Sequence, residues 1–246
     1  MSLLLAEGIL VRFGGLRALS EATVAVEAGR VTGLIGPNGA GKTTCFNVIC
    51  GLQEPDAGRV LLDGVDITRA SPYRRARLGI ARTFQRLEAF TSLTARDNVR
   101  VAAEQRRAWD RTAPDPLRVA EELLDRVGIA EVADQMAGTL PTGTARRVEL
   151  ARALATRPRV LLLDEPSSGL DDEETAALAR LLHDLAAEGL GVLLVEHDVT
   201  LVMGTCAHIY VLDFGRVIAE GPPDRIRADA AVQAAYLGAV ISGAGR

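Results

Sequence analysis

A glycine-rich segment near the start of the chain constrains its fold and its ligand more than any other feature. Residues 36–43 read Gly-Pro-Asn-Gly-Ala-Gly-Lys-Thr and match the phosphate-binding pattern G-x-x-x-x-G-K-[ST] at every fixed position. The apolar run at 31–35 predicts a buried strand before the segment, and the apolar spacing after it predicts a helix over 43–50. A strand, a glycine loop and a helix N-terminus together direct backbone N–H groups at an anion. Because the motif and its flanks agree, the sequence favours a nucleoside triphosphate site over a glycine-rich turn that binds nothing.

Two side chains of this loop have distinct expected roles. Lys42 would reach the β- and γ-phosphates as a point charge, and the hydroxyl of Thr43 would ligate Mg²⁺. The residues of this segment that we expect to contact the nucleotide are Gly36, Pro37, Asn38, Gly39, Ala40, Gly41, Lys42, Thr43 and Thr44.

The composition is that of a globular protein with an aliphatic core. Of the 246 residues 48% are hydrophobic but only 4% aromatic, so Leu, Val, Ile and Ala must fill the interior. The net charge of −4 argues against a general nucleic-acid binder. No apolar run approaches the ~20 residues that span a bilayer, and the first residues lack the basic region of a signal peptide. We therefore expect a cytosolic protein unless a partner holds it at a membrane, with Cys45, Cys50 and Cys206 reduced and mostly buried.

The first part of the chain alternates apolar and polar residues, as half-buried strands do. This pattern predicts antiparallel strands near residues 8–13 and 22–26 and a hairpin over 59–67. The hairpin is expected to turn at its Asp-Gly pair, which suits a two-residue loop. A short basic helix over 72–78 would then lead into a strand at 80–84.

From about residue 87 to residue 140 the strand patterns disappear. Two helices are predicted over 94–107 and 117–127, separated by a proline-rich link. A third helix, rich in Arg and Ala, is predicted from about 143 to 156. We interpret this region as a helical insertion in an α/β domain.

Strands and helices alternate again in the second half of the chain. The apolar runs at 160–163 and 191–195 predict buried strands, and a helix is predicted between them over 172–187. Asp171 and Glu174 have the spacing of a capping box at the start of that helix. The alternation predicts a mainly parallel sheet covered on both faces, followed by two more strands and short C-terminal helices.

Each of the three predicted buried strands ends in residues with chemical function. The first leads into the phosphate loop, the second into Asp164-Glu165, and the third into Glu196-His197-Asp198. Ligands of open α/β sheets bind beyond the carboxyl ends of the strands, so we expect these groups to meet at one edge.

The acidic pair after the second strand is costly to place near a core without a counterion. Asp164 would hold Mg²⁺, and Glu165 would orient or deprotonate the water that attacks the γ-phosphate. The alternative is that both residues only cap the turn that follows. A lone histidine after a strand is often structural, but beside a phosphate loop His197 is expected to sense the γ-phosphate.

Together these motifs resemble the ATP-binding subunit of ABC transporters, and the resemblance covers nearly the whole chain. It implies that Gln85 contacts Mg²⁺ and couples to a membrane subunit, and that Asp164 holds the metal. It also implies that Glu165 is the catalytic glutamate, His197 the switch histidine, and Phe13 the aromatic residue that stacks on adenine. Residues 168–171 match the family's D-loop.

The resemblance also implies an architecture and cofactors. Residues 1–246 would form a single ABC ATPase domain that binds ATP and Mg²⁺. Its antiparallel β subdomain and P-loop core would comprise residues 1–86 and 157–222. A helical subdomain would span about 87–156, and C-terminal helices would span 223–246.

Closer features are similar to the branched-chain amino acid importers. They are residues 79–85, 196–203 and 235–238. In that subfamily two different ATPase subunits pair, and this chain resembles the longer one. The resemblance implies a second, different ABC ATPase subunit, two integral membrane permease subunits and, indirectly, a solute-binding protein. It places the chain at the inner face of the membrane and implies no nucleic-acid partner.

The chain departs from the family at the ABC signature, which typically reads Leu-Ser-Gly-Gly-Gln. Here the segment reads Leu140-Pro141-Thr142-Gly143-Thr144, so a proline with neither hydroxyl nor N–H replaces the signature serine. The signature contacts ATP held by the opposite subunit, so Pro141, Thr142 and Gly143 would face the partner's nucleotide. We therefore expect a heterodimer with unequal sites, in which Lys42 and Glu165 serve the hydrolysing one.

Two other functions remain open from the sequence. Pro141 favours a regulatory subunit that binds nucleotide with little turnover, whereas the intact Lys42, Asp164, Glu165 and His197 oppose it. A soluble ABC-type ATPase acting on ribosomes or DNA is disfavoured by the acidic charge, the single phosphate loop and the lack of a long coiled-coil insertion. The solute cannot be read from the chain, because other subunits would contact it.

Overall fold

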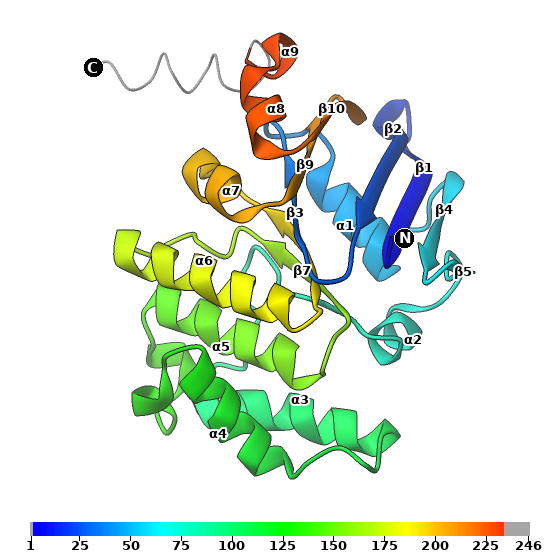
Figure 1. Ribbon diagram of the computed structural model, residues 1–246. Helices are drawn as coiled ribbons and strands as arrows, with labels where there is room; N and C mark the ends of the chain where they lie inside the picture. The colour runs from blue at the N-terminus through cyan, green and yellow to red at the C-terminus, as the bar shows by residue number, and fades with distance from the viewer. Residues whose placement is uncertain (1, 234–246) are drawn as a thin grey trace.

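The computed structural model describes residues 2–233, and it contains two β-sheets with helices packed around them (Figure 1). The smaller sheet has the strand order β2-β1-β4-β5, and the larger has the order β10-β9-β3-β8-β7-β6. The smaller sheet comprises β1 (Leu4–Phe13), β2 (Leu16–Val26), β4 (Ala57–Leu62) and β5 (Val65–Asp66). The larger sheet comprises β3 (Val31–Ile35), β6 (Ile80–Arg82), β7 (Val160–Asp164), β8 (Gly191–Val195), β9 (His208–Asp213) and β10 (Arg216–Gly221).

The predicted sheet types are confirmed. All pairings in the smaller sheet are antiparallel. In the larger sheet β6, β7, β8, β3 and β9 run parallel, and only the edge strand β10 pairs antiparallel with β9. The predicted strand at 80–84 is shorter than expected, since β6 ends at Arg82.

The predicted helices are present with small shifts at their ends, and one further helix, α7 between β8 and β9, was not predicted. The helices are α1 (Lys42–Cys50), α2 (Pro72–Arg77), α3 (Ala95–Trp109), α4 (Pro116–Arg126), α5 (Thr142–Ala155), α6 (Asp172–Ala187), α7 (Val199–Thr205), α8 (Pro223–Ala228) and α9 (Ala230–Val232), with short 3₁₀ turns η1 (Ala130–Val132) and η2 (Ala137–Thr139). The capping box of α6 is confirmed: the Glu174 backbone N–H donates to Asp171 Oδ1 over 2.8 Å, and the Asp171 N–H donates to Glu174 Oε2 over 3.1 Å. The predicted C-terminal segment 235–238 lies outside the described residues.

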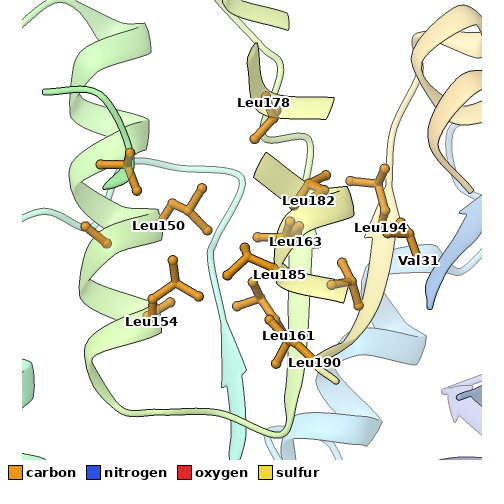
Figure 2. Close-up of a cluster of buried hydrophobic side chains, with 14 of the residues drawn as sticks. Val31, Leu150, Leu154, Leu161, Leu163, Leu178, Leu182, Leu185, Leu190 and Leu194 are labelled. Carbon is orange, nitrogen blue, oxygen red and sulfur yellow. The ribbon is translucent and has the colours of Figure 1, made fainter. Parts of the chain in front are cut away.

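The larger sheet is buried on both faces, as the unbroken apolar runs predict. Leu161 and Leu163 of β7 point to one face and pack with α5 and α6, whereas Val160 and Leu162 point to the other. Figure 2 shows the first of these clusters, with leucines of α5, α6 and β7 meeting between helices and sheet. The opposite face packs against α1 and the antiparallel sheet. This packing fixes the strands whose ends carry the predicted site.

The helical insertion lies at one end of the molecule, away from the antiparallel sheet (Figure 1). Helices α3 and α4 pack on each other and on α5, which in turn packs on the larger sheet. Thr94 and Asp115 cap α3 and α4 by accepting hydrogen bonds from backbone N–H groups of their first turns. Among residues 2–233, no helix combines the length and the hydrophobicity needed to cross a bilayer.

The three cysteines are free thiols, and Cys45 and Cys206 are buried, as predicted. Burial raises the pKa of Cys45 and of Cys206 to about 12. Cys50, at the end of α1, is partly buried, and its pKa is raised by burial to about 11.

Two hairpins of the chain turn through a pair of residues with positive φ, and they differ in the first residue of the pair. Asp63-Gly64 joins β4 to β5 with φ angles of 50° and 76°, and Phe214-Gly215 joins β9 to β10 with φ angles of 41° and 77°. Aspartate and asparagine tolerate this left-handed conformation, whereas phenylalanine adopts it only with backbone strain. Phe214 is 87% exposed, so packing does not compensate for the strain.

Replacing Phe214 by Asn is therefore expected to raise the free energy of unfolding by about 1 kcal/mol, because the new residue suits a positive φ. Denaturant unfolding of the purified chain measures this change. Asp63→Phe, the reverse exchange in the other hairpin, should lower the same free energy. Equal stability of Phe214→Asn and the wild type would contradict the expected backbone strain.

Candidate nucleotide site

The three strands that end in functional residues are neighbours in the larger sheet, in the order β3-β8-β7. They run parallel, and Asp164 at the end of β7 lies beside Val195 at the end of β8. The phosphate loop, the acidic pair and His197 therefore follow strand ends on one edge of the sheet, as the sequence predicted.

Gly36 and Gly41 of the phosphate loop occupy positions where a side chain would not fit. A Cβ on Gly36, whose φ is 151°, would lie 1.9 Å from the carbonyl oxygen of Leu212. A Cβ on Gly41, whose φ is 109°, would lie 2.5 Å from the carbonyl oxygen of Ala18. The loop is thus packed closely between β9 and β2, and its backbone can approach a phosphate without side chains in the way.

Lys42 lies inside this loop and is only 7% exposed. Its Nζ donates to the carbonyl oxygens of Gly36 and Pro37 over 2.6 and 3.0 Å. Burial lowers the pKa of Lys42, and the charges of Glu165 and Asp164 act against that shift. Both carboxylates are therefore close enough to act on the lysine, which is the arrangement expected around a bound phosphate chain.

Glu165 forms the centre of a hydrogen-bonded group at this edge. Its Oε1 lies 2.7 Å from His197 Nε2, and its Oε2 accepts a hydrogen bond from Gln85 Nε2 over 3.1 Å. The backbone of Glu165 has a φ of 51°, and its N–H donates to the carbonyl oxygen of Val195. This left-handed conformation is uncommon for a non-glycine residue, although Asp63 and Phe214 also adopt it in hairpin turns. The structure thus brings together three of the residues for which the sequence predicts a catalytic role.

Glu196 is a contributor whose role the sequence did not reveal. It is buried beside His197, and burial raises its pKa. Its carboxylate accepts hydrogen bonds from the backbone N–H groups of Ser167, over 2.7 Å, and His197, over 3.2 Å. Glu196 therefore joins the segment after Glu165 to the strand end that carries His197.

The predicted metal ligands suit Mg²⁺ more than a transition metal. Asp164 is 2% exposed, and Thr43 lies exposed at the start of α1. Within the described part of the chain, no three His, Cys, Asp or Glu residues group as a metal cage. Mg²⁺ typically binds one or two protein oxygens together with phosphates and water, so the residues present fit it.

The signature-like segment lies against the predicted D-loop of its own chain. Pro141 is the N-cap residue of α5 and makes no side-chain capping bond. Gly143 is buried, and a Cβ there would lie 2.8 Å from Leu170 Cδ2 and 3.2 Å from the Gly169 carbonyl oxygen. Pro141 and Thr142 remain exposed. Exposed residues at a helix N-terminus can meet a ligand held by another chain.

Phe13, predicted to stack on adenine, ends β1 at the β1–β2 turn and is 51% exposed. The close approach of β2 to the phosphate loop occurs at Ala18. The role of Phe13 therefore stays a prediction.

Arg146 of α5 was not recognised from the sequence. Its Nε donates to the Ser168 carbonyl oxygen over 2.9 Å, and its Nη2 donates to the Gln85 carbonyl oxygen over 3.1 Å. One side chain of the helical insertion therefore holds the two loops that flank Glu165. An Arg/Ala-rich helix gives no sign of which arginine does this.

A groove of about 820 Å³ lies next to Gln85, between the larger sheet and the helical insertion. Exposed apolar side chains line it, including Leu52, Phe84 and Phe90, which are 53%, 37% and 49% exposed. At its floor Arg152 donates to the Glu88 carbonyl oxygen over 2.7 Å and lies over the Phe90 ring. An exposed apolar hollow of this kind is typical of a protein interface.

Known proteins are similar to this chain over the region that contains these motifs. A family model described as "ABC transporter" matches residues 19–168, and one described as "Branched-chain amino acid ATP-binding cassette transporter" matches residues 216–241. The high-affinity branched-chain amino acid transport ATP-binding protein BraF of Pseudomonas aeruginosa is 41% identical over an alignment 244 positions long, which covers 94% of this chain and 96% of BraF.

Other relatives agree at the level of the family. The lipopolysaccharide export system ATP-binding protein LptB of Haemophilus influenzae is 36% identical over 97% of this chain and 98% of LptB. The ADP conformation of an ATP-binding cassette of an ABC transporter is similar in structure, with a TM-score of 0.86 and 31% identity over 97% of this chain and 99% of that one. The chain is therefore an ATP-binding subunit, and an ATPase, of the ABC transporter family.

Proposed function

We propose that this ATPase powers the import of branched-chain or related amino acids. The observation that carries the proposal is the combined similarity to BraF and to the branched-chain amino acid family model at 216–241. The similarity to LptB, named for lipopolysaccharide export, is the reason for keeping the solute open to test.

Each group of site residues would have a separate role in ATP hydrolysis. The loop amides and Lys42 would hold the phosphates, so Nζ would exchange the carbonyls of Gly36 and Pro37 for phosphate oxygens. Glu165 would orient the attacking water and accept its proton, with His197 and Gln85 holding the carboxylate in place.

Mg²⁺, when bound, would neutralise charge on the phosphates, with Thr43, Asp164 and Gln85 as its expected protein ligands. The remaining nucleotide contacts would come from the loop residues 36–44, from Phe13 at the base, and from the partner's signature segment.

The groove beside Gln85 is the surface that we expect to receive a permease. Its exposed aromatic residues, Phe84 and Phe90, flank the segment that contains Gln85, so an occupant would lie within a few residues of the Glu165 cluster. We propose two integral membrane permease subunits, and indirectly a solute-binding protein, as partners. The chain would then lie in the cytoplasm at the inner face of the membrane.

Purification from solubilised membranes tests this assignment. The chain should co-purify with two permease subunits, and a binding protein loaded with leucine, isoleucine or valine should stimulate phosphate release by the complex. Stimulation by a lipid substrate, or co-purification with ribosomes, would contradict the proposal.

We further propose that the second ATPase subunit is a different chain and that the two ATP sites are unequal. Pro141 offers no hydroxyl to the partner's nucleotide, and loss of one aimed donor costs about 2.7–4 kcal/mol at a transition state. Inactivating one catalytic glutamate at a time tests this. Glu165→Gln should nearly abolish turnover, by about 10²–10⁴-fold, whereas the matching change in the partner should be tolerated; equal losses from both would contradict unequal sites.

A low-turnover regulatory subunit is the second candidate, and Pro141 is the observation that favours it. The rate of phosphate release with and without the permease distinguishes the two. A rate that stays near zero in the complete transporter would support the regulatory role.

A further inference from the structure

Arg82, the last residue of β6, lines the groove described above, and its side chain is buried between two aromatic rings. Its side chain is 5% exposed, and its guanidinium carbon lies 5.2 Å from the centre of the Phe46 ring and 4.8 Å from that of Phe84. A buried guanidinium needs well-placed partners to offset the loss of hydration. Arg82 has two: Nη1 donates to Asn47 Oδ1 over 2.6 Å, and Nη2 donates to Asp164 Oδ2 over 2.8 Å.

The two partners of Arg82 belong to the elements that carry two of the expected Mg²⁺ ligands, Asp164 and Thr43. Asp164 ends β7, and Asn47 lies on α1 four residues after Thr43. Residues four apart in a helix lie on the same face, so Asn47 follows Thr43 along α1. The planar fork of Arg82 therefore connects the strand that carries Asp164 to the helix that carries Thr43.

The bond from Arg82 also leaves one oxygen of Asp164 available. Only Oδ2 receives the guanidinium, and within residues 2–233 no hydrogen bond reaches Oδ1. Because the carboxylate is 2% exposed, it can turn little without losing the charged partner.

We propose that Arg82 is a positioning residue, which fixes the Asp164 carboxylate relative to α1 so that its free oxygen faces the Mg²⁺ of the bound nucleotide. The inference rests on the role of Asp164 in the proposed function. Partners that orient a ligand in this way typically contribute 10–100-fold to metal affinity.

Two substitutions separate positioning from charge. Arg82→Lys keeps the positive charge but offers a single ammonium, which cannot bond Asn47 and Asp164 with the geometry of a fork. Asn47→Ala leaves the ion pair and removes only the bond that orients it. Arg59→Lys is the matched control, because Arg59 forms a 2.7 Å pair with Glu7 that is exposed and belongs to the antiparallel sheet.

The measurement is nucleotide binding by the purified full chain, followed with a fluorescent ATP analogue. Titration with Mg²⁺ gives the metal concentration at half-maximal effect, and titration of the analogue in EDTA gives the metal-free affinity. Arg82→Lys should raise the required Mg²⁺ by about 10–100-fold, and Asn47→Ala should raise it less. Both should leave the metal-free affinity unchanged, whereas general loosening of the fold would lower it. Arg59→Lys should change neither.

Unchanged Mg²⁺ dependence in folded Arg82→Lys and Asn47→Ala would overturn the inference. If Arg82→Lys does not fold, Asn47→Ala alone decides it. Asp164→Asn separates the role of Arg82 from the role of Asp164. If Asp164→Asn strongly raises the required Mg²⁺ but the other two variants do not, only the positioning role of Arg82 is rejected. If Asp164→Asn has no effect on the required Mg²⁺, the proposed role of Asp164 is rejected as well.

Discussion

Replacing Glu165 by Gln is expected to slow ATP hydrolysis by the assembled transporter by about 10²–10⁴-fold, the usual contribution of a general base. Glutamine has nearly the same shape, so the contacts with His197 and Gln85 can largely persist, but its amide cannot accept a proton from water. ATP binding by the isolated chain should be retained, because the phosphate loop is untouched. Phosphate release and nucleotide binding measure the two properties separately.

Glu196→Gln provides the matched control for this prediction. Glu196 lies on the adjacent strand end, but its carboxylate faces the backbone N–H groups of Ser167 and His197. The substitution replaces one accepting oxygen of the carboxylate by an NH₂ group. It should lower the rate of ATP hydrolysis by less than about 10-fold, in the range of a single neutral hydrogen bond. If Glu165→Gln kept a rate near that of the wild type, another group would have to act as the base.

Replacing Arg75 by Met is expected to lower the free energy of unfolding by about 3–5 kcal/mol. Arg75 lies on α2 and is 1% exposed. Its guanidinium donates to four carbonyl oxygens, those of Val48 and Ile49 at 2.6 and 2.7 Å, Thr68 at 2.7 Å and Ala70 at 3.0 Å. Methionine would fill the space and remove all four of these hydrogen bonds, and only the Val48 carbonyl would keep another donor, the Gly51 N–H.

Urea unfolding measures the loss, and Arg74→Met is its control. Arg74 precedes Arg75 on the same helix but is exposed, so its replacement should change stability by less than about 0.5 kcal/mol. Similar effects of the two substitutions would show that the buried bonds contribute little. Two of the four acceptors belong to the last turn of α1, so Arg75 also compensates the negative end of the phosphate-loop helix.

The elements that the sequence predicted best are those with one clear periodicity and a local end signal. The strand at 31–35 and the capped helix at 172–187 have the predicted bounds. The first strand was predicted too short, because the pairing of β1 shifts between Ala6 and Ile9 and breaks the period of two. Gly8, within that shift, has a φ of 60°.

The predicted site residues at the three strand ends did meet at one edge, since parallel strand order follows from alternating strands and helices. The arginines that connect separate elements could not be found this way. Arg74, Arg75 and Arg77 stand in one short basic helix, yet only Arg75 is buried. Its acceptors on α1 lie 26 and 27 residues away, and no local pattern marks such a contact.

The roles of Phe13 and Pro141 and the division into subdomains stay predictions. The first two concern contacts with a nucleotide and with another chain. Both contacts form only when the nucleotide and the other chain are bound, so a single sequence does not determine them.

The burial of the cysteines has a consequence for the reactivity of the protein. A thiol with a pKa of about 11, as at Cys50, is ionised in only about one molecule in 10⁴ at pH 7, and Cys45 and Cys206 less still. Oxidants and alkylating reagents should therefore leave the three thiols of the folded chain nearly untouched. A single exposed cysteine introduced on the rim of the groove would then be the dominant reactive thiol, so its rate of labelling would report directly whether a partner covers that surface.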